Sequence, residues 1–179
     1  MKHVAIALML AAVPGMAAAQ TPACVPQDQA AALVTFALPT MVEQLANRCT
    51  AELPPSAYLI ANATRLAERY RGDSTAAWPV ARKAIAGLFT QFLGQPMPAE
   101  MNSDMVRTLA EPMLGGMLAK QIDHEDCGVA DRAITDVAQL SGRAIGRLAV
   151  LAVTVADRKD KGIAGMLHVC RTGGAAPRD

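Results

Sequence analysis

The sequence predicts an all-α fold, a compact bundle of five to six amphipathic helices held by two disulfides. Apolar residues recur at spacings of three and four along most of the 179-residue chain, which is typical of helices that bury one face. No stretch combines alternating apolar and polar residues with the β-branched enrichment of strands. The four cysteines follow a start that is typical of exported proteins, and export favours disulfides.

The first 19 residues predict a secretory signal peptide. Lys2 precedes an apolar run over residues 4–13, and small residues at Ala17 and Ala19 suit a signal peptidase. The run is shorter than the ~20 residues that a membrane-spanning helix needs. We therefore expect cleavage after Ala19, a periplasmic or secreted protein without a transmembrane segment, one helical domain over residues 20–171, and a flexible tail over 172–179.

Three helices are predicted in the first half of the chain. The first covers residues 27–49, and Pro39 should kink it. Ser56 is placed to cap the second helix, which we expect to end at Gly72 because glycine commonly terminates helices. The third continues from Asp73 or Ser74 to residue 93, where Gly94 and "QPMP" should end it.

Helical periodicity also dominates the second half. A fourth helix is expected over residues 103–122, kinked at Pro112. The residues assigned to its inward face are Met105, Val106, Leu109, Met113, Met117 and Leu118. After Cys127 the pattern continues to residue 156, with Ser141 and Gly142 as the point of interruption, and a short helix over 162–170 closes the fold. The residues expected on the apolar side of the 127–156 stretch are Ile134, Val137, Leu140, Ala144, Ile145, Leu148, Leu151, Ala152 and Val155. Gly142 and Gly146 are spaced for close approach to a neighbouring helix.

Cys24, Cys49, Cys127 and Cys170 are predicted to form two disulfides, since no C-x-x-C redox or metal motif is present. If the first five helices alternate in direction, Cys24 and Cys127 lie at one end of the bundle and Cys49 lies at the other, near Cys170. This favours the pairs Cys24–Cys127 and Cys49–Cys170. Pairing Cys24 with Cys49 is disfavoured, because a continuous helix of about 22 residues separates its ends by roughly 33 Å. A sharp reversal at Pro39 would remove that objection.

The stretch "DHEDC" at residues 123–127 concentrates groups that bind metals. The nitrogen and sulfur ligands that a zinc site would use are His124, Cys127, His168 and Cys170. Their spacing matches no recurrent zinc motif, and a disulfide explains the cysteines more simply. The acidic residues suit the start of the following helix, where negative charge interacts favourably with the exposed N–H groups.

A second metal hypothesis comes from methionine. Met97, Met101 and Met105 repeat every four residues, and Met113 and Met117 continue the row. Thioether sulfur is a soft ligand that selects Cu(I), so a periplasmic metal-handling protein using this row, or His124 and His168, is an alternative function. The simpler interpretation is an apolar helix face filled by flexible side chains.

No motif for catalysis or for a cofactor is present. The chain has no G-x-S-x-G, H-E-x-x-H or phosphate-binding glycine loop, so no catalytic residue and no cofactor is predicted. A small hydrolase with paired carboxylates is a second alternative, because carboxylates at Glu43, Glu52, Glu68, Glu100 and Glu111 are available.

The charge balance bears on partners. Loss of Lys2 with the signal peptide would leave equal numbers of basic and acidic residues, and nucleic-acid binding normally needs a strongly basic surface. Nucleic acid is therefore not an expected partner. The leading interpretation is an exported, non-catalytic binding module for an unknown protein or a small apolar ligand in its alanine- and methionine-rich interior.

Overall fold

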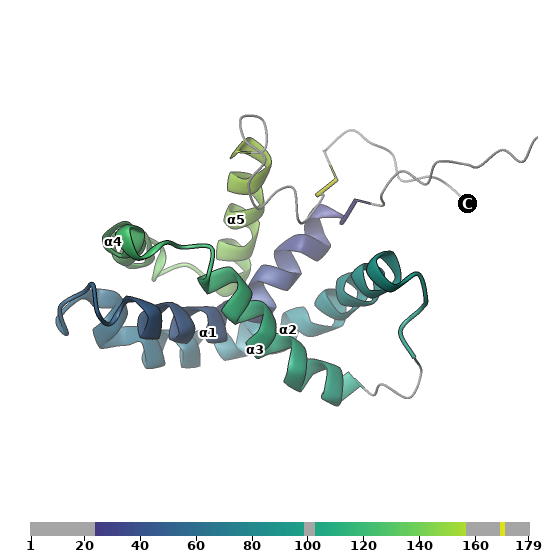
Figure 1. Cartoon of the computed structure of the whole chain (residues 1–179), viewed down its shortest axis with the longest axis horizontal. Helices are drawn as coiled ribbons and strands as arrows, with labels where there is room; N and C mark the ends of the chain where they lie inside the picture. The colour runs from purple at the N-terminus through teal and green to yellow at the C-terminus, as the bar shows by residue number, and fades with distance from the viewer. Residues whose placement is uncertain (1–23, 99–102, 157–168, 171–179) are drawn as a thin grey trace, which may run out of the picture.

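The computed structural model describes residues 24–98, 103–156 and 169–170. Over these residues the chain forms α1 (Gln27–Cys49), α2 (Tyr58–Leu93), α3 (Ser103–Ala119), the 3-10 turn η1 (His124–Asp126), α4 (Cys127–Val137) and α5 (Gly142–Ala156). The predicted all-α bundle is thus confirmed (Figure 1). Three expectations fall outside the described residues: the signal peptide at 1–19, the tail at 172–179, and residues 162–168 of the predicted last helix.

α1 is the central helix, and it contacts α2, α3 and α5. Its sequence carries apolar residues on most sides, which is typical of a helix enclosed by others rather than one with a single buried face. Phe36, Leu38 and Leu45 are at most 1% exposed. Pro39 is also buried inside the helix, and the ribbon of α1 changes direction along its length, as expected where proline removes a backbone hydrogen bond (Figure 1).

α2 is one helix of 36 residues, so the predicted end at Gly72 is wrong. Glycine inside a helix costs only about 1 kcal/mol, which tertiary contacts readily offset. Ser74 supplies one such contact, because its buried hydroxyl donates to the carbonyl oxygen of Phe36 at 2.8 Å. Asp73 does not cap its own helix but accepts a hydrogen bond at 2.7 Å from the backbone N–H of Gly142, at the start of α5.

The disulfides are Cys24–Cys170 and Cys49–Cys127, so the predicted pairing is wrong although the number of bonds is correct. The error follows from α2. With no reversal at Gly72, the chain reaches α4 after one turn fewer, and Cys127 arrives at the same end of α1 as Cys49. Cys170 returns to the beginning of α1, where Val169 forms a parallel bridge with Val25 (Figure 1). Val169 and Cys170 are therefore not helical, contrary to the predicted last helix.

Small residues allow α3 and α5 to lie close against α1. A Cβ atom built on Gly115 would lie 2.8 Å from the backbone nitrogen of Met41. One built on Gly146 would lie 2.5 Å from the carbonyl oxygen of Ala31. The close approach predicted for Gly142 and Gly146 is confirmed, since Gly142 also packs against Asp73.

These close contacts decide which faces of α3 and α5 are buried. Val106, Ala110 and Leu114 of α3 pack against the core beside Trp78. The apolar residues predicted to face inward but found exposed are Met105, Leu109, Met113, Met117, Leu148, Leu151, Ala152 and Val155. Both helices carry two apolar faces. Periodicity alone does not indicate which face is buried, because the close contact of Gly115 or Gly146 with α1 determines it. Within the described ranges, none of the helices is both long and apolar enough to cross a membrane.

Candidate functional site

The "DHEDC" stretch forms a disulfide arm at the start of a helix, as predicted. His124, Glu125 and Asp126 are exposed in the η1 turn, and Cys127 begins α4 with its sulfur bonded to Cys49. Cys127 is 1% exposed, whereas its acidic neighbours face solvent. The stretch therefore joins α4 to α1 rather than gathering its side chains around a common centre.

The two cysteines of the zinc hypothesis are not available as thiolate ligands and do not lie together. Cys127 and Cys170 belong to different disulfides, and His168 lies outside the described residues. Across the ranges that the structure describes, no three His, Cys, Asp or Glu side chains are grouped as a metal site would require.

The methionine row is divided among different surroundings. Met97 is partly buried in the loop before α3, Met101 lies outside the described residues, and Met105 is on the exposed side of α3. The copper hypothesis stays untested, because its middle residue is not described.

Of the carboxylates in the hydrolase hypothesis, Glu43 and Glu68 lie on the surface, and Glu100 lies outside the described residues. Arg71 lies 3.1 Å from Glu68 and 3.9 Å from Glu43, all three side chains being at least 40% exposed. Neither carboxylate lines either of the clefts described below. Surface ion pairs of this kind contribute little to stability and mark no reaction centre by themselves.

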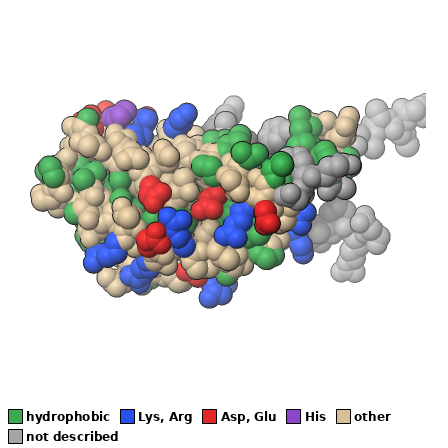
Figure 2. Space-filling view, turned by 90° about the horizontal axis from the view of Figure 1, so that it is seen from below, with side chains coloured by type: hydrophobic (Ala, Val, Ile, Leu, Met, Phe, Trp, Pro, Cys, Tyr) green, Lys and Arg blue, Asp and Glu red, His purple; other side chains and the backbone are tan. Residues whose placement is uncertain are grey.

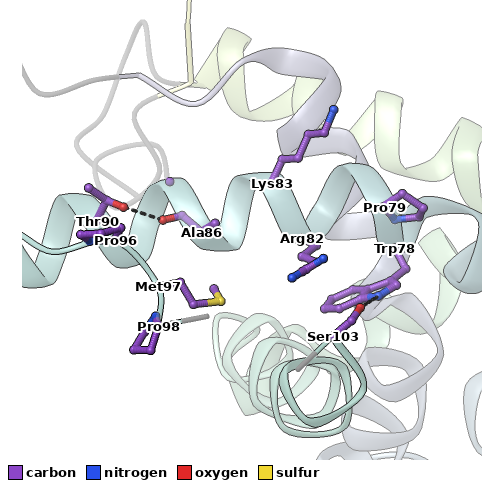
Figure 3. A pocket seen from close by; sticks show the side chains of 11 residues that line it. Trp78, Pro79, Arg82, Lys83, Ala86, Thr90, Pro96, Met97, Pro98 and Ser103 are labelled. Carbon is purple, nitrogen blue, oxygen red and sulfur yellow. Dashed lines mark hydrogen bonds between the residues drawn. The ribbon is translucent and has the colours of Figure 1, made fainter. Parts of the chain in front are cut away.

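A cleft of about 720 Å³, here called the Trp78 cleft, opens between the second half of α2 and the loop that leads to α3 (Figure 3). Its volume lies within the roughly 300–1,000 Å³ range of small-molecule sites. The apolar part of its wall comes from Trp78, Pro79, Ala86, Pro96, Met97 and Pro98.

The sequence explains why this space is open. The side chains of α2 at Ala86 and Gly87 are too small to fill the space beside the helix, and a Cβ atom added at Gly87 would meet nothing within 4 Å. Gly94 ends α2 in the left-handed conformation at φ 68°, which turns the chain back beside the helix. The prolines on either side of Met97 then restrict the loop that faces α2.

Trp78 connects the cleft to the protein core. Its indole packs against Phe36 with ring centroids 4.9 Å apart, and only 8% of the residue is exposed. Its Nε1–H donates a hydrogen bond to Ser103 Oγ at 3.1 Å, at the first residue of α3. The ring is therefore held in place before any ligand arrives, which reduces the ordering cost of binding.

Two cations of α2 border the cleft, but their side chains take different directions. Figure 3 shows Arg82 on the side of the helix where Trp78 and Met97 lie, whereas the Lys83 side chain points to the opposite side. Within the described part of the chain, no hydrogen bond or ion pair engages Arg82, and no acidic side chain lines the cleft. The spacing of Trp78, Arg82 and Ala86 was visible in the sequence, but nothing there indicated which side of α2 the loop would cover.

A second cleft of about 490 Å³ lies between α1, α2 and α5. Its floor is formed by small apolar residues such as Ala31 and Ala77, and its ionisable residues are Arg143, Arg147 and Asp28. Arg143 is paired with Asp73 at 3.5 Å. Both signs of charge are present, so this cleft has no clear charge preference.

One further exposed feature is the α3 outer face, defined as Leu109, Met113 and Met117. These side chains follow one another at four-residue intervals and are 62%, 67% and 42% exposed. By contrast, basic and acidic side chains are interspersed over the surface shown in Figure 2, which carries no large region of a single sign.

Comparison with protein-family models, curated proteins and solved structures finds no match for this chain, so its candidate functions rest on its own residues.

Proposed function

We propose that this protein is an exported, non-catalytic binding module that holds a small apolar ligand in the Trp78 cleft. Two disulfides are compatible with an oxidising compartment outside the cytoplasm. The signal peptide at residues 1–19 would direct the chain to the periplasm or the medium, leaving one domain over 20–171 and a flexible tail over 172–179.

The observation that carries the proposal is the mainly apolar wall of the cleft around a fixed indole. Small-molecule sites are concave, largely apolar and largely formed in advance. The Trp78 cleft is concave and largely apolar. It is also formed in advance, because Trp78 packs against Phe36 and donates a hydrogen bond to Ser103. Among the described residues that line it, there is no histidine, cysteine or carboxylate.

Binding of the neutral fluorescent dye Nile red tests the proposal. The dye should bind the oxidised protein with enhanced emission, and Ala86→Leu should abolish this because the added side chain fills the space beside Trp78. Ala61→Leu is the matched control, since Ala61 is exposed on the same helix and lines neither cleft. Absence of dye binding, or equal binding by both variants, would contradict an apolar ligand in this cleft.

The α3 outer face favours a second candidate function, contact with an apolar surface of another protein. Three large apolar side chains exposed in one row are typical of interaction surfaces. Met113→Glu should leave the fold intact and prevent co-purification of a partner from the native envelope fraction. Thr108→Glu, on the same helix but outside the row, should retain the partner. Equal recovery with both variants would argue against this surface.

A further inference from the structure

The Trp78 cleft joins an apolar wall to the unengaged guanidinium of Arg82. Arg82 lies on the cleft side of α2, and no hydrogen bond or ion pair with another described residue satisfies its guanidinium. The arginines Arg48, Arg65, Arg69, Arg71, Arg107 and Arg143 each have a hydrogen-bond or ion-pair partner, whereas Arg82, like Arg132 and Arg147, has none among the described residues. Arg82 therefore retains its full capacity to bind an anion.

The charge around Arg82 selects the sign of the ligand. No acidic side chain lines the cleft among the residues described, and Lys83 adds positive charge on the far side of the helix. A guanidinium presents two parallel N–H donors that match the two oxygens of a carboxylate. The apolar wall begins one helical turn away, at Trp78 and Ala86.

We propose that the Trp78 cleft binds a single-chain apolar carboxylate, with the carboxylate on Arg82 and the hydrocarbon against Trp78 and Met97. This inference rests on the proposed function and adds the class of ligand. A neutral apolar ligand of the same shape would crowd the guanidinium while giving it no acceptor, which disfavours it. A polyphosphate would need several converging cations, whereas Figure 3 shows Arg82 on the side of Trp78 and Met97 and Lys83 pointing to the opposite side.

The test compares decanoate with decanol, which share a hydrocarbon chain and differ in the charged head group. Each is titrated below its aggregation concentration into the oxidised protein, and emission of the sole tryptophan reports binding. Decanoate should bind about tenfold more tightly than decanol, the difference that a charge-assisted hydrogen bond to a carboxylate typically gives.

Two neighbouring variants separate contact from general charge. Arg82→Gln should weaken decanoate to the affinity of decanol, whereas Lys83→Gln should leave the preference for decanoate unchanged, because that side chain points away from the cleft. Both residues are exposed, so both variants should keep the helical circular dichroism spectrum of the parent.

The possible results distinguish failure of the carboxylate inference from failure of the proposed binding function. Equal affinities for decanoate and decanol would overturn the carboxylate inference and leave an apolar binding module. Equal losses in the Arg82 and Lys83 variants would also overturn it, because long-range charge would then explain the preference. Binding of neither compound, together with no Nile red binding, would remove the proposed function itself.

Discussion

Replacing Gly146 with alanine should destabilise the protein, because α5 and α1 leave no room for a methyl group. The new Cβ atom would lie 2.5 Å from the carbonyl oxygen of Ala31 and would also clash with Thr35 Oγ1. Neither neighbour moves easily. The Ala31 oxygen belongs to the helix backbone, and the Thr35 hydroxyl is buried and donates to Ala31 at 2.8 Å.

The magnitude is the difference between two opposing effects. Alanine is favoured over glycine in a helix by about 1 kcal/mol, whereas overpacking a well-filled contact costs typically about 1–3 kcal/mol. A clash with backbone lies toward the upper end of that range, so we expect a net loss of about 1–2 kcal/mol. For a domain of this size, the loss would lower Tm by roughly 2–8 °C.

Urea unfolding with the disulfides intact, followed by circular dichroism, measures this change. Gly87→Ala is the matched control, because a Cβ atom there meets nothing within 4 Å and α2 should gain about 1 kcal/mol from the better helix former. If both substitutions stabilise the protein equally, α5 does not pack on α1 through Gly146 and the reasoning fails.

Three other substitutions test separate features by the same unfolding assay. Gly72→Ala should stabilise the protein by about 1 kcal/mol if α2 is continuous, whereas a loss would mean that the helix ends there. Asp131→Ala should cost about 1 kcal/mol, because the Asp131 carboxylate accepts a 2.6 Å hydrogen bond from the N–H of Leu59 at the start of α2; an equal loss for the exposed Asp136→Ala would refute this capping role. Burial raises the pKa of the Tyr70 phenol above its ordinary value of 10.0, so the neutral form favours folding. The stability that it contributes should be complete below about pH 10 and lost at more alkaline pH, and Tyr70→Phe should remove that part of the dependence; an unchanged alkaline profile would contradict it.

Helix positions were predictable because local patterns determine them. The bounds of α1 and the break near Ser141 follow from periodicity and from residues that start or end helices. Gly72 was misjudged because its local signal is weak, and the helix continues through contacts with α1 that are distant in sequence. That single error reversed the disulfide pairing, since pairing depends on how many times the chain changes direction.

The candidate site was less predictable than the helices. The "DHEDC" stretch has the highest density of reactive side chains, yet it forms a disulfide arm. The cleft is instead built from Ala86, Gly87 and a proline-rich loop. Such residues contribute to a site by leaving space for a ligand, not by supplying reactive groups. That space exists only once α2, the loop and α3 are assembled, so no local pattern reveals it.

The bond between Cys24 and Cys170 has a mechanical consequence. It joins positions separated by 146 residues, and all five described helices lie between them. A force that pulls on the chain before Cys24 and after Cys170 is carried by one covalent bond and bypasses the hydrogen bonds and packing of every helix. Under tension the oxidised domain should therefore behave as a short inextensible link, and reduction of this disulfide should be required before the helices can be drawn out.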